Sequence, residues 1–217
     1  KTDSLPSEIA DSLKKKSIHL GLHACNLPQD VGGGGLDAVT LMLIEKELGR
    51  TSLALAECVH RPLNILAACE GEQKNQFLYP TIMGKKRECI AMTEPGSGSD
   101  LRSMKCNAKL EGKEWIINGE KHFISQASIS DYCVLFASTG EEETDKGLKK
   151  RISAFLIDFE DTGVEVLHGY KNVSHRGYTN NILRFNNVRI PDWRIMGLEG
   201  DGFRLVNEWL GPTRLTV

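Results

Sequence analysis

A change of hydrophobic periodicity near Glu88 constrains the fold of this chain more than any other feature of its sequence. Before Glu88, apolar residues recur three or four apart between helix-capping signals, as they do in amphipathic helices. After it, short apolar runs alternate with polar residues and turn signals, as they do in β-strands. The sequence therefore predicts an α+β chain, with a helical domain at 1–87, a β domain at 88–198 and the start of a second helical domain at 199–217.

The helical domain carries clear start and stop signals. Asp37 can cap an apolar run that Gly49 closes, and Ser52 can cap the next run. A further helix is predicted over 72–83, where apolar residues have helical spacing. Pro80 is expected to kink or shorten this helix, because proline has no N–H to donate.

The β domain is expected to form an antiparallel barrel or sandwich. We expect roughly seven strands, at residues 104–110, 115–118, 121–125, 132–137, 152–158, 164–167 and 182–190. An Asn118-Gly119 turn is expected to reverse the chain between the second and third of these. Residues 140–151 are nearly all charged or small, which predicts a solvated loop. Beyond the strands, a periodic apolar face begins the last helix, with Phe203, Val206 and Leu210.

Composition excludes several classes of protein. The net charge of -2 and pI near 6.3 provide no basic surface for nucleic acid. No apolar run approaches the roughly 20 residues that a membrane-spanning helix needs, and no signal-peptide pattern opens the chain. We therefore expect an intracellular soluble protein, cytoplasmic or, in a eukaryote, in the mitochondrial matrix. The cysteines are scattered singly and are expected to be buried free thiols in a reducing compartment: Cys25, Cys58, Cys69, Cys89, Cys106 and Cys133.

Two segments of the β domain carry candidate binding residues. The first, from Thr93 to Asp100, follows a short apolar run and is rich in Gly and Ser, whose backbone can approach a bound group closely. In the second, from Gly119 to Ser125, Phe123 and Ser125 fall two apart on one face of a strand. An aromatic ring beside a hydroxyl suits a planar heterocycle. We therefore expect the two segments to form one wall of a site for such a heterocycle.

The two segments, in this order and separation, resemble the signature of the acyl-CoA dehydrogenase family of flavoenzymes. The resemblance implies that the heterocycle is a flavin. The likeness runs from about Leu20 to the last residue, and it includes the stretch from Gly71 to Lys74 that opens a helix ahead of the first segment. Family members are usually close to twice this length, with a helical, a β and a second helical domain. The resemblance implies that this chain is a fragment that stops in the first helix of the third domain.

The resemblance also implies roles for individual residues. In the family, residues that match Met92 and Thr93 meet the pyrimidine edge of FAD, while those that match Phe123 and Ser125 lie over the flavin ring and reach its N5. The family more often has Trp and Thr at the last two positions, so this chain keeps an aromatic face and a hydroxyl. The serine that matches Ser99 lies by the acyl-CoA substrate and the flavin pyrophosphate.

A catalytic base is not found among these residues. Dehydrogenation needs a carboxylate to remove the α proton while a hydride passes from the β carbon to flavin N5. In most of the family this base is a glutamate in the last helical domain, and in some members it precedes the arginine of the helix that matches 208–217. Here that position is Thr213, before Arg214, so the base lies beyond Val217 or is absent. Thr213 and Arg214 resemble residues that line the substrate site.

Several other charged residues are candidates for catalytic or binding roles. Glu94 and Asp100 could form an acid/base pair, but such carboxylates more commonly bind turn backbone or a neighbour such as Arg102, so we assign both to structural roles. His175-Arg176 is a candidate for a cofactor or subunit contact. The stretch 176–180 departs from the commoner family pattern, which leaves the usual straight-chain substrates open to question.

The leading interpretation is an FAD-dependent acyl-CoA dehydrogenase, reoxidised by an electron-transfer flavoprotein or a similar acceptor and assembled as a homodimer or homotetramer when intact. An acyl-CoA oxidase or flavin monooxygenase of the same superfamily is the first alternative, which oxygen consumption would distinguish. A non-catalytic FAD-binding or scaffolding relative is the second. Without the last helical domain, the face of Phe203, Val206 and Leu210 is expected to be exposed, which predicts aggregation or partial order.

Overall fold

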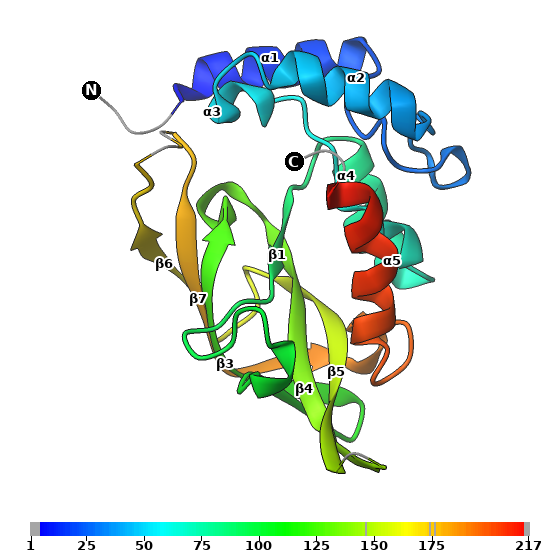
Figure 1. The fold of residues 1–217 in the computed structure, drawn as a ribbon, viewed down its shortest axis with the longest axis vertical. Helices are drawn as coiled ribbons and strands as arrows, with labels where there is room; N and C mark the ends of the chain where they lie inside the picture. Colours follow the sequence, from blue (N-terminus) through cyan, green and yellow to red (C-terminus); the bar gives the residue numbers. More distant parts are fainter. Residues whose placement is uncertain (1–4, 146, 174, 176, 215–217) are drawn as a thin grey trace.

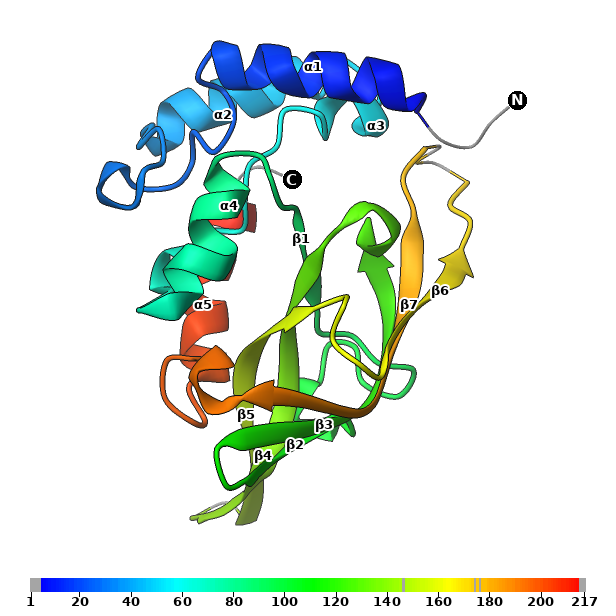
Figure 2. The ribbon, with the colours of Figure 1, turned by 180° about the vertical axis from the view of Figure 1, so that it is seen from behind.

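The computed structural model describes residues 5–145, 147–173, 175 and 177–214, with helices at one end of the molecule and a curled β-sheet at the other (Figure 1). The α-helices of this part are α1 (Ser7–His19), α2 (Ala38–Leu48), α3 (Leu53–Ala56), α4 (Tyr79–Ile82) and α5 (Gly202–Arg214). Helices α1, α2 and α3 lie across the end of the sheet, while α4 and α5 run beside it, as the view from behind also shows (Figure 2). The predicted α+β class is confirmed.

Local signals set the ends of the helices. The Asp37 carboxylate accepts hydrogen bonds from the N–H groups of Val39 and Thr40, so it caps α2, which ends before Gly49 as predicted. Ser52 precedes α3 but makes no side-chain capping bond. The predicted helix over 72–83 widens to a π-helix at Lys74–Leu78 before α4 begins. Pro80 lacks the N–H that a regular α-helical turn requires, which accounts for the distortion.

The sheet is mixed, with most neighbouring strands antiparallel. Its strands follow the order β6, β7, β3, β2, β4, β5, β8, and β1 pairs in parallel with β4. Their bounds are β1 (Glu88–Ala91), β2 (Asn107–Glu111), β3 (Glu114–Ser125), β4 (Tyr132–Thr144), β5 (Gly147–Asp158), β6 (Val164–Tyr170), β7 (Asn180–Pro191) and β8 (Ile195–Met196). The core runs along β4 and β5, where the side chains at 132–137 and 154–157 are fully buried.

The predicted turn at Asn118-Gly119 is wrong, because β3 runs unbroken through both residues. The chain reverses earlier, at Gly112 between β2 and β3, where φ is +66°. Gly119 lies instead at a shift of register between β3 and β7, and a Cβ there would lie 2.6 Å from the Cα of Cys106. The glycine therefore permits a close approach of two backbone segments rather than a turn.

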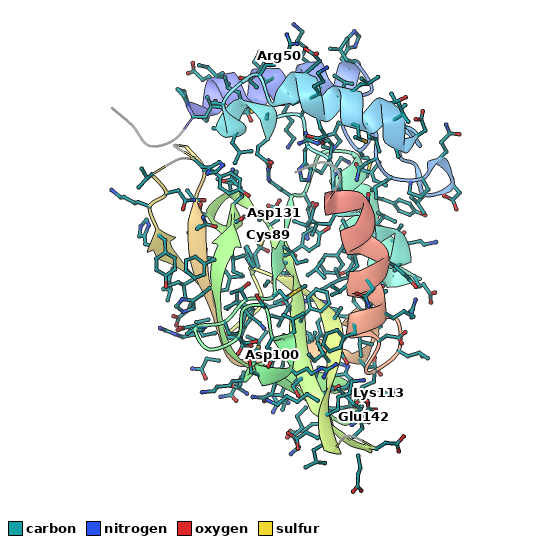
Figure 3. The ribbon with its side chains drawn as sticks, viewed as in Figure 1. Arg50, Cys89, Asp100, Lys113, Asp131 and Glu142 are labelled. Atoms are coloured by element: carbon teal, nitrogen blue, oxygen red, sulfur yellow. The ribbon has the colours of Figure 1, made fainter. Side chains whose placement is uncertain are left out.

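The predicted loop at 140–151 is also wrong, since β4 and β5 stay paired as far as Thr144 and Gly147. Glu142, at this exposed end of the hairpin (Figure 3), makes an ion pair with Lys149 across the strands. Backbone pairing satisfies the polar groups of the main chain while the charged side chains stay in solvent. The charged composition of this segment therefore led to the prediction of a loop, although the segment extends both strands.

The expected exposure of the α5 face is wrong for Val206, which is buried, and Phe203 packs against the core. Helix α5 packs against β5 and the short 3₁₀ helix η2 (Asn64–Ala68). The Leu210 side chain lies outside the described residues. All six cysteines are free and buried, as predicted. Among the described residues, no helix has the length and apolar character needed to span a membrane.

Candidate functional site

The structure brings the two predicted binding segments together. The first forms a loop at 92–100 that follows β1, and the second is the last part of β3. The main-chain N–H of His122 donates a hydrogen bond of 2.8 Å to the carbonyl of Thr93. The backbone of the 92–100 loop is therefore fixed directly against the strand that carries Phe123 and Ser125.

A buried ion pair holds the 92–100 loop from beneath. The Lys121 ammonium lies 2.7 Å from a carboxylate oxygen of Glu94, and their side chains are 0% and 4% exposed. Lys121 also donates to the Met92 carbonyl at 3.0 Å. The Glu94 carboxylate accepts two further bonds, from the N–H groups of Lys105 and Cys106. The structural role predicted for Glu94 is confirmed.

Lys121 was not singled out from the sequence, although a signal was present. Trp115 and Ile117 are buried along β3, and the same alternation places Lys121 on the inner face of the sheet. A lysine at an inward-facing position needs a buried partner, and Glu94 is that partner.

The remainder of the 92–100 loop is a tight turn. Glu94 and Ser97 exchange two main-chain hydrogen bonds, and the buried Ser97 hydroxyl donates to the carbonyl of Asp100. The Asp100 carboxylate accepts from the Arg102 N–H, which is the turn role predicted for it. Ser99 is exposed, and no hydrogen bond within the described residues uses the amide of Gly98 or Ser99. Two main-chain donors and a hydroxyl are therefore available at this turn.

Phe123 occupies an unusual position at the end of β3. Its φ is +56°, in the left-handed region that bulky residues rarely adopt, and it lies where the register between β3 and β7 shifts. Its side chain is 56% exposed, whereas Ile124 beside it is buried. The exposed ring stacks on Tyr170 of β6, with centroids 4.4 Å apart.

Ser125 ends β3 and is partly buried. Its hydroxyl donates to the side-chain oxygen of Asn180 at 3.3 Å, and Asn180 is also its main-chain neighbour on β7. Tyr178 is a further neighbour: burial raises the pKa of the Tyr178 hydroxyl, and its hydrogen bond with Ser125 opposes that rise. No individual role for Asn180 or Tyr178 was predicted from the sequence. Both were noted only because the stretch 176–180 departs from the commoner family pattern.

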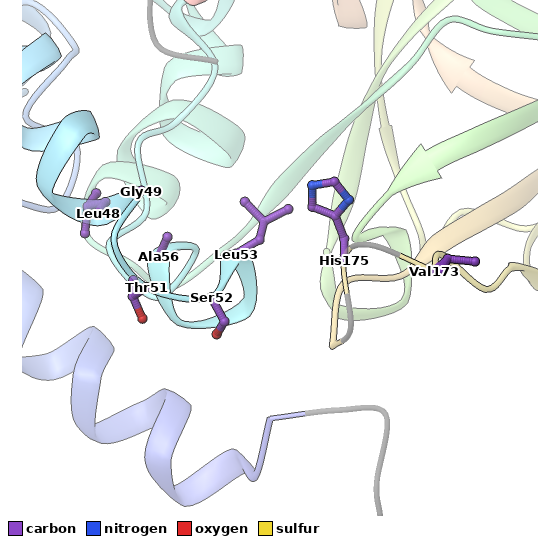
Figure 4. Close-up of a pocket in the computed structure, with 8 residues that line it drawn as sticks. All are labelled: Leu48, Gly49, Thr51, Ser52, Leu53, Ala56, Val173 and His175. Atoms are coloured by element: carbon purple, nitrogen blue, oxygen red, sulfur yellow. The ribbon is translucent and has the colours of Figure 1, made fainter.

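The remaining candidate residues lie apart from this wall or are not described. Thr213 and Arg214 fall in the last turn of α5, and their side chains, like Arg176, lie outside the described residues. His175 lines a separate cavity of about 540 Å³, opposite residues of α2, α3 and the segment between them (Figure 4). None of Met92, Thr93, Ser99, Phe123 and Ser125 lines that cavity. In the part of the chain that the structure describes, no three His, Cys, Asp or Glu side chains are grouped to hold a metal.

Comparison with known proteins gives consistent matches along the chain. Residues 2–85 match the family described as acyl-CoA dehydrogenase, N-terminal domain, and residues 89–188 match the acyl-CoA dehydrogenase middle domain. The short-chain specific acyl-CoA dehydrogenase of human mitochondria is 33% identical over 208 residues, which are 94% of this chain and 50% of that protein. The cyclohex-1-ene-1-carbonyl-CoA dehydrogenase of Geobacter metallireducens is 35% identical over 202 residues, 90% of this chain and 52% of that one.

A solved structure gives the same match in three dimensions. The acyl-CoA dehydrogenase of Bacillus anthracis, complexed with FAD, superposes with a TM-score of 0.83 at 26% identity. The superposition covers 97% of this chain and 36% of the Bacillus chain. This chain spans about half the length of the curated relatives that it matches.

Proposed function

Because this chain belongs to the acyl-CoA dehydrogenase family, we propose that it forms part of an FAD-dependent enzyme that dehydrogenates an acyl-CoA thioester between its α and β carbons. The hydrogen bond from His122 to the Thr93 carbonyl carries the proposal, because it fixes the two binding segments as one surface. The named relatives act on acyl-CoA thioesters, and the Bacillus structure holds FAD.

The polar and aromatic groups of this surface fit a flavin. The carbonyls of Met92 and Thr93 are committed to Lys121 and His122, while no hydrogen bond within the described residues uses the Thr93 hydroxyl. Phe123 follows the His122 that bonds Thr93, and it is more than half exposed. A planar ring system requires an aromatic face together with a few fixed polar groups at its edge, and this surface offers both.

We assign the binding roles accordingly. Met92 and Thr93 meet the pyrimidine edge of the flavin, and Phe123 covers its ring. The Ser125 hydroxyl serves the flavin N5 in exchange for its bond to the Asn180 side chain. FAD, when bound, supplies the acceptor for the hydride from the substrate β carbon. Ser99 and the available amides of its turn bind anionic groups of the cofactor and of the acyl-CoA substrate.

The substrate side of the site involves other parts of the protein. We propose that Thr213 and Arg214 line the acyl-CoA site, on the strength of their resemblance to substrate-lining residues in the family. None of the residues assigned to the site can act as the base that removes the α proton. We assign that step to a carboxylate beyond Val217.

The assembly of the whole enzyme completes the proposal. We propose a helical domain at 1–87, a β domain at 88–198 and the start of a second helical domain at 199–217, and a homodimer or homotetramer of the intact protein. Its electrons pass to an electron-transfer flavoprotein or a similar acceptor. We place the enzyme in the cytoplasm or, in a eukaryote, in the mitochondrial matrix. The names of the human and rat relatives describe those proteins as mitochondrial.

Anaerobic titration of the purified full-length protein tests this function. The visible flavin band is recorded while straight-chain, branched and cyclic acyl-CoA thioesters are added in turn, with free CoA as the control. The proposal predicts that at least one thioester bleaches the band and that free CoA does not. A flavin band that no thioester bleaches would contradict the dehydrogenation, and a protein that takes up no FAD would contradict the binding surface as well. Oxygen consumption after bleaching separates an oxidase from a dehydrogenase.

A further inference from the structure

The orientation of the Phe123 ring is not explained by burial. More than half of its side chain is exposed, and its backbone has a φ of +56°. This region is sterically unfavourable for an L-residue, so neighbouring groups must hold Phe123 there. The contacts of the ring show which groups these are.

Tyr170 is the neighbour that supports the ring. The two rings are nearly parallel, with an interplanar angle of 21° and centroids 4.4 Å apart. Tyr170 is the last residue of β6 and pairs with Asn180 at the end of β7, beside the end of β3. It is itself 41% exposed, so burial does not fix its orientation either.

His122 fixes Tyr170 in turn. Its Nδ1 lies 2.7 Å from the Tyr170 hydroxyl, and its Nε2 lies 2.7 Å from a carboxylate oxygen of Glu120. Arg184 of β7 holds the other oxygen of Glu120 at 3.0 Å and also reaches Glu165 of β6. These contacts form a continuous chain across three strands, from Arg184 through Glu120 and His122 to the Tyr170 hydroxyl.

His122 also links this chain to the 92–100 loop, because its main-chain N–H is the donor to Thr93. One residue therefore connects the loop assigned to the pyrimidine edge with the ring assigned to the flavin face. A cluster that served only to join strands would not require an aromatic residue in a left-handed conformation at its centre.

We propose that Tyr170, held by His122 and Glu120, is a positioning residue that fixes the Phe123 ring against the bound flavin. This inference rests on the proposed function, because it assigns Phe123 to the flavin face. It adds three residues, Tyr170, His122 and Glu120, that set the geometry of the cofactor site without contacting the substrate.

The stack itself can be tested in the protein before FAD is added. The NMR resonances of the Phe123 ring, assigned through a Phe123→Leu variant, are compared in Tyr170→Ala, Tyr170→Phe and Tyr79→Ala. Tyr79 is a matched control, because it is 40% exposed but lies on α4. We expect Tyr170→Ala to shift the Phe123 resonances strongly, Tyr170→Phe to shift them weakly, and Tyr79→Ala to leave them in place. Unchanged resonances in Tyr170→Ala would overturn the stack.

The same variants in the FAD-loaded full-length protein test the positioning role. We expect Tyr170→Ala to change the visible circular dichroism of the bound flavin and to weaken FAD binding about 2- to 12-fold, the range that an aromatic pair contributes. Tyr170→Phe should restore most of both signals, and His122→Leu should resemble Tyr170→Phe. A double variant Tyr170→Phe/His122→Leu should be no worse than either single change, because both remove the same hydrogen bond.

The possible failures are distinguishable. If Tyr170→Ala shifts the Phe123 resonances but leaves the flavin dichroism and the FAD affinity equal to those of Tyr79→Ala, the stack exists and the positioning role is wrong. If the unmodified protein takes up no FAD, the proposed function fails first, and the positioning role fails with it.

Discussion

The two segments of the proposed flavin wall are held in opposite ways. The 92–100 loop rests on the buried ion pair of Glu94 and Lys121, which lies inside the sheet and binds three main-chain groups. Phe123 lies at the surface and is held by an exposed ring and by polar side chains around it. Removing a buried charge affects the whole fold, whereas removing a surface contact affects only its neighbours. Changes in the loop support should therefore act on stability, and changes around Phe123 should act on the cofactor.

The largest expected effect follows removal of the Glu94 carboxylate. Glu94→Ala leaves the buried Lys121 ammonium without its counter-charge and with only the Met92 carbonyl to bond, and it removes the acceptor of the Lys105 and Cys106 N–H groups. This should cost about 3–5 kcal/mol of unfolding free energy. Urea denaturation of the protein measures the loss. Glu142→Ala is the control, because its ion pair with Lys149 is exposed, and it should change stability by less than about 0.5 kcal/mol. Equal stability of the two variants would contradict the loop support.

Phe123→Ala should separate cofactor binding from stability. The loss of an aromatic face should weaken FAD binding by about 1–3 kcal/mol, the scale that stacking on a heterocycle contributes. Because Phe123 is exposed, the unfolding free energy should change by less than about 1 kcal/mol. Flavin fluorescence titration gives the first quantity and urea denaturation the second. If Phe123→Ala lowers the unfolding free energy as much as Glu94→Ala does, the two segments are not held in different ways.

A smaller effect tests the backbone at Phe123. Both Phe123→Gly and Phe123→Ala remove the ring, but glycine adopts a φ of +56° without steric penalty. The glycine variant should therefore be more stable than the alanine variant by about 1 kcal/mol. At an ordinary strand position the glycine variant would be less stable than the alanine variant. Finding the glycine variant less stable would therefore exclude the left-handed conformation of Phe123.

The smallest effect concerns pH. The hydrogen bond from His122, with help from Arg184, holds the pKa of the Glu120 carboxyl below its ordinary value of 4.5. A carboxyl whose pKa is lowered by folding adds stability above its unfolded pKa and loses it as the pH falls through its folded pKa. The stability difference between the unmodified protein and Glu120→Gln should therefore be present above pH 4.5 and be lost as the pH falls below it. The difference should stay under about 1 kcal/mol, since the group is partly exposed. A difference that changes between pH 6 and 8 would implicate another group.

Local signals in the sequence predicted much of the helical part. Asp37 caps α2 and Gly49 ends it because both act through their own backbone or nearest neighbours. The turn predicted at Gly119 was wrong because a glycine can serve either a turn or a close approach of two backbone segments. Here it allows the approach to Cys106, and only the tertiary structure distinguishes these two roles. The end of the hairpin at 140–151 was missed since its pairing depends on the partner strand rather than on its own side chains.

The sequence predicted the two segments of the candidate site but not the residues that hold those segments in place. Thr93 and Ser125 could be proposed from the sequence because they stand in recognisable patterns. Lys121 and Tyr170 were missed because their roles depend on residues far apart in the sequence, and the left-handed backbone of Phe123 has no signature in its side chain. Alternation along β3 could have placed Lys121 inside, whereas nothing in the sequence pairs Tyr170 with His122.

The affinity of the full-length protein for FAD, measured by titration of the cofactor-free form, tests the central claim most directly. Three forms are compared: the unmodified protein, Ser125→Ala in the proposed wall, and Ser12→Ala at an exposed position on α1. We predict saturable binding that Ser125→Ala weakens about 2- to 12-fold, as expected for one lost hydrogen bond, and that Ser12→Ala leaves unchanged. Equal affinity of all three forms, or no uptake of FAD, would contradict the assignment of this wall.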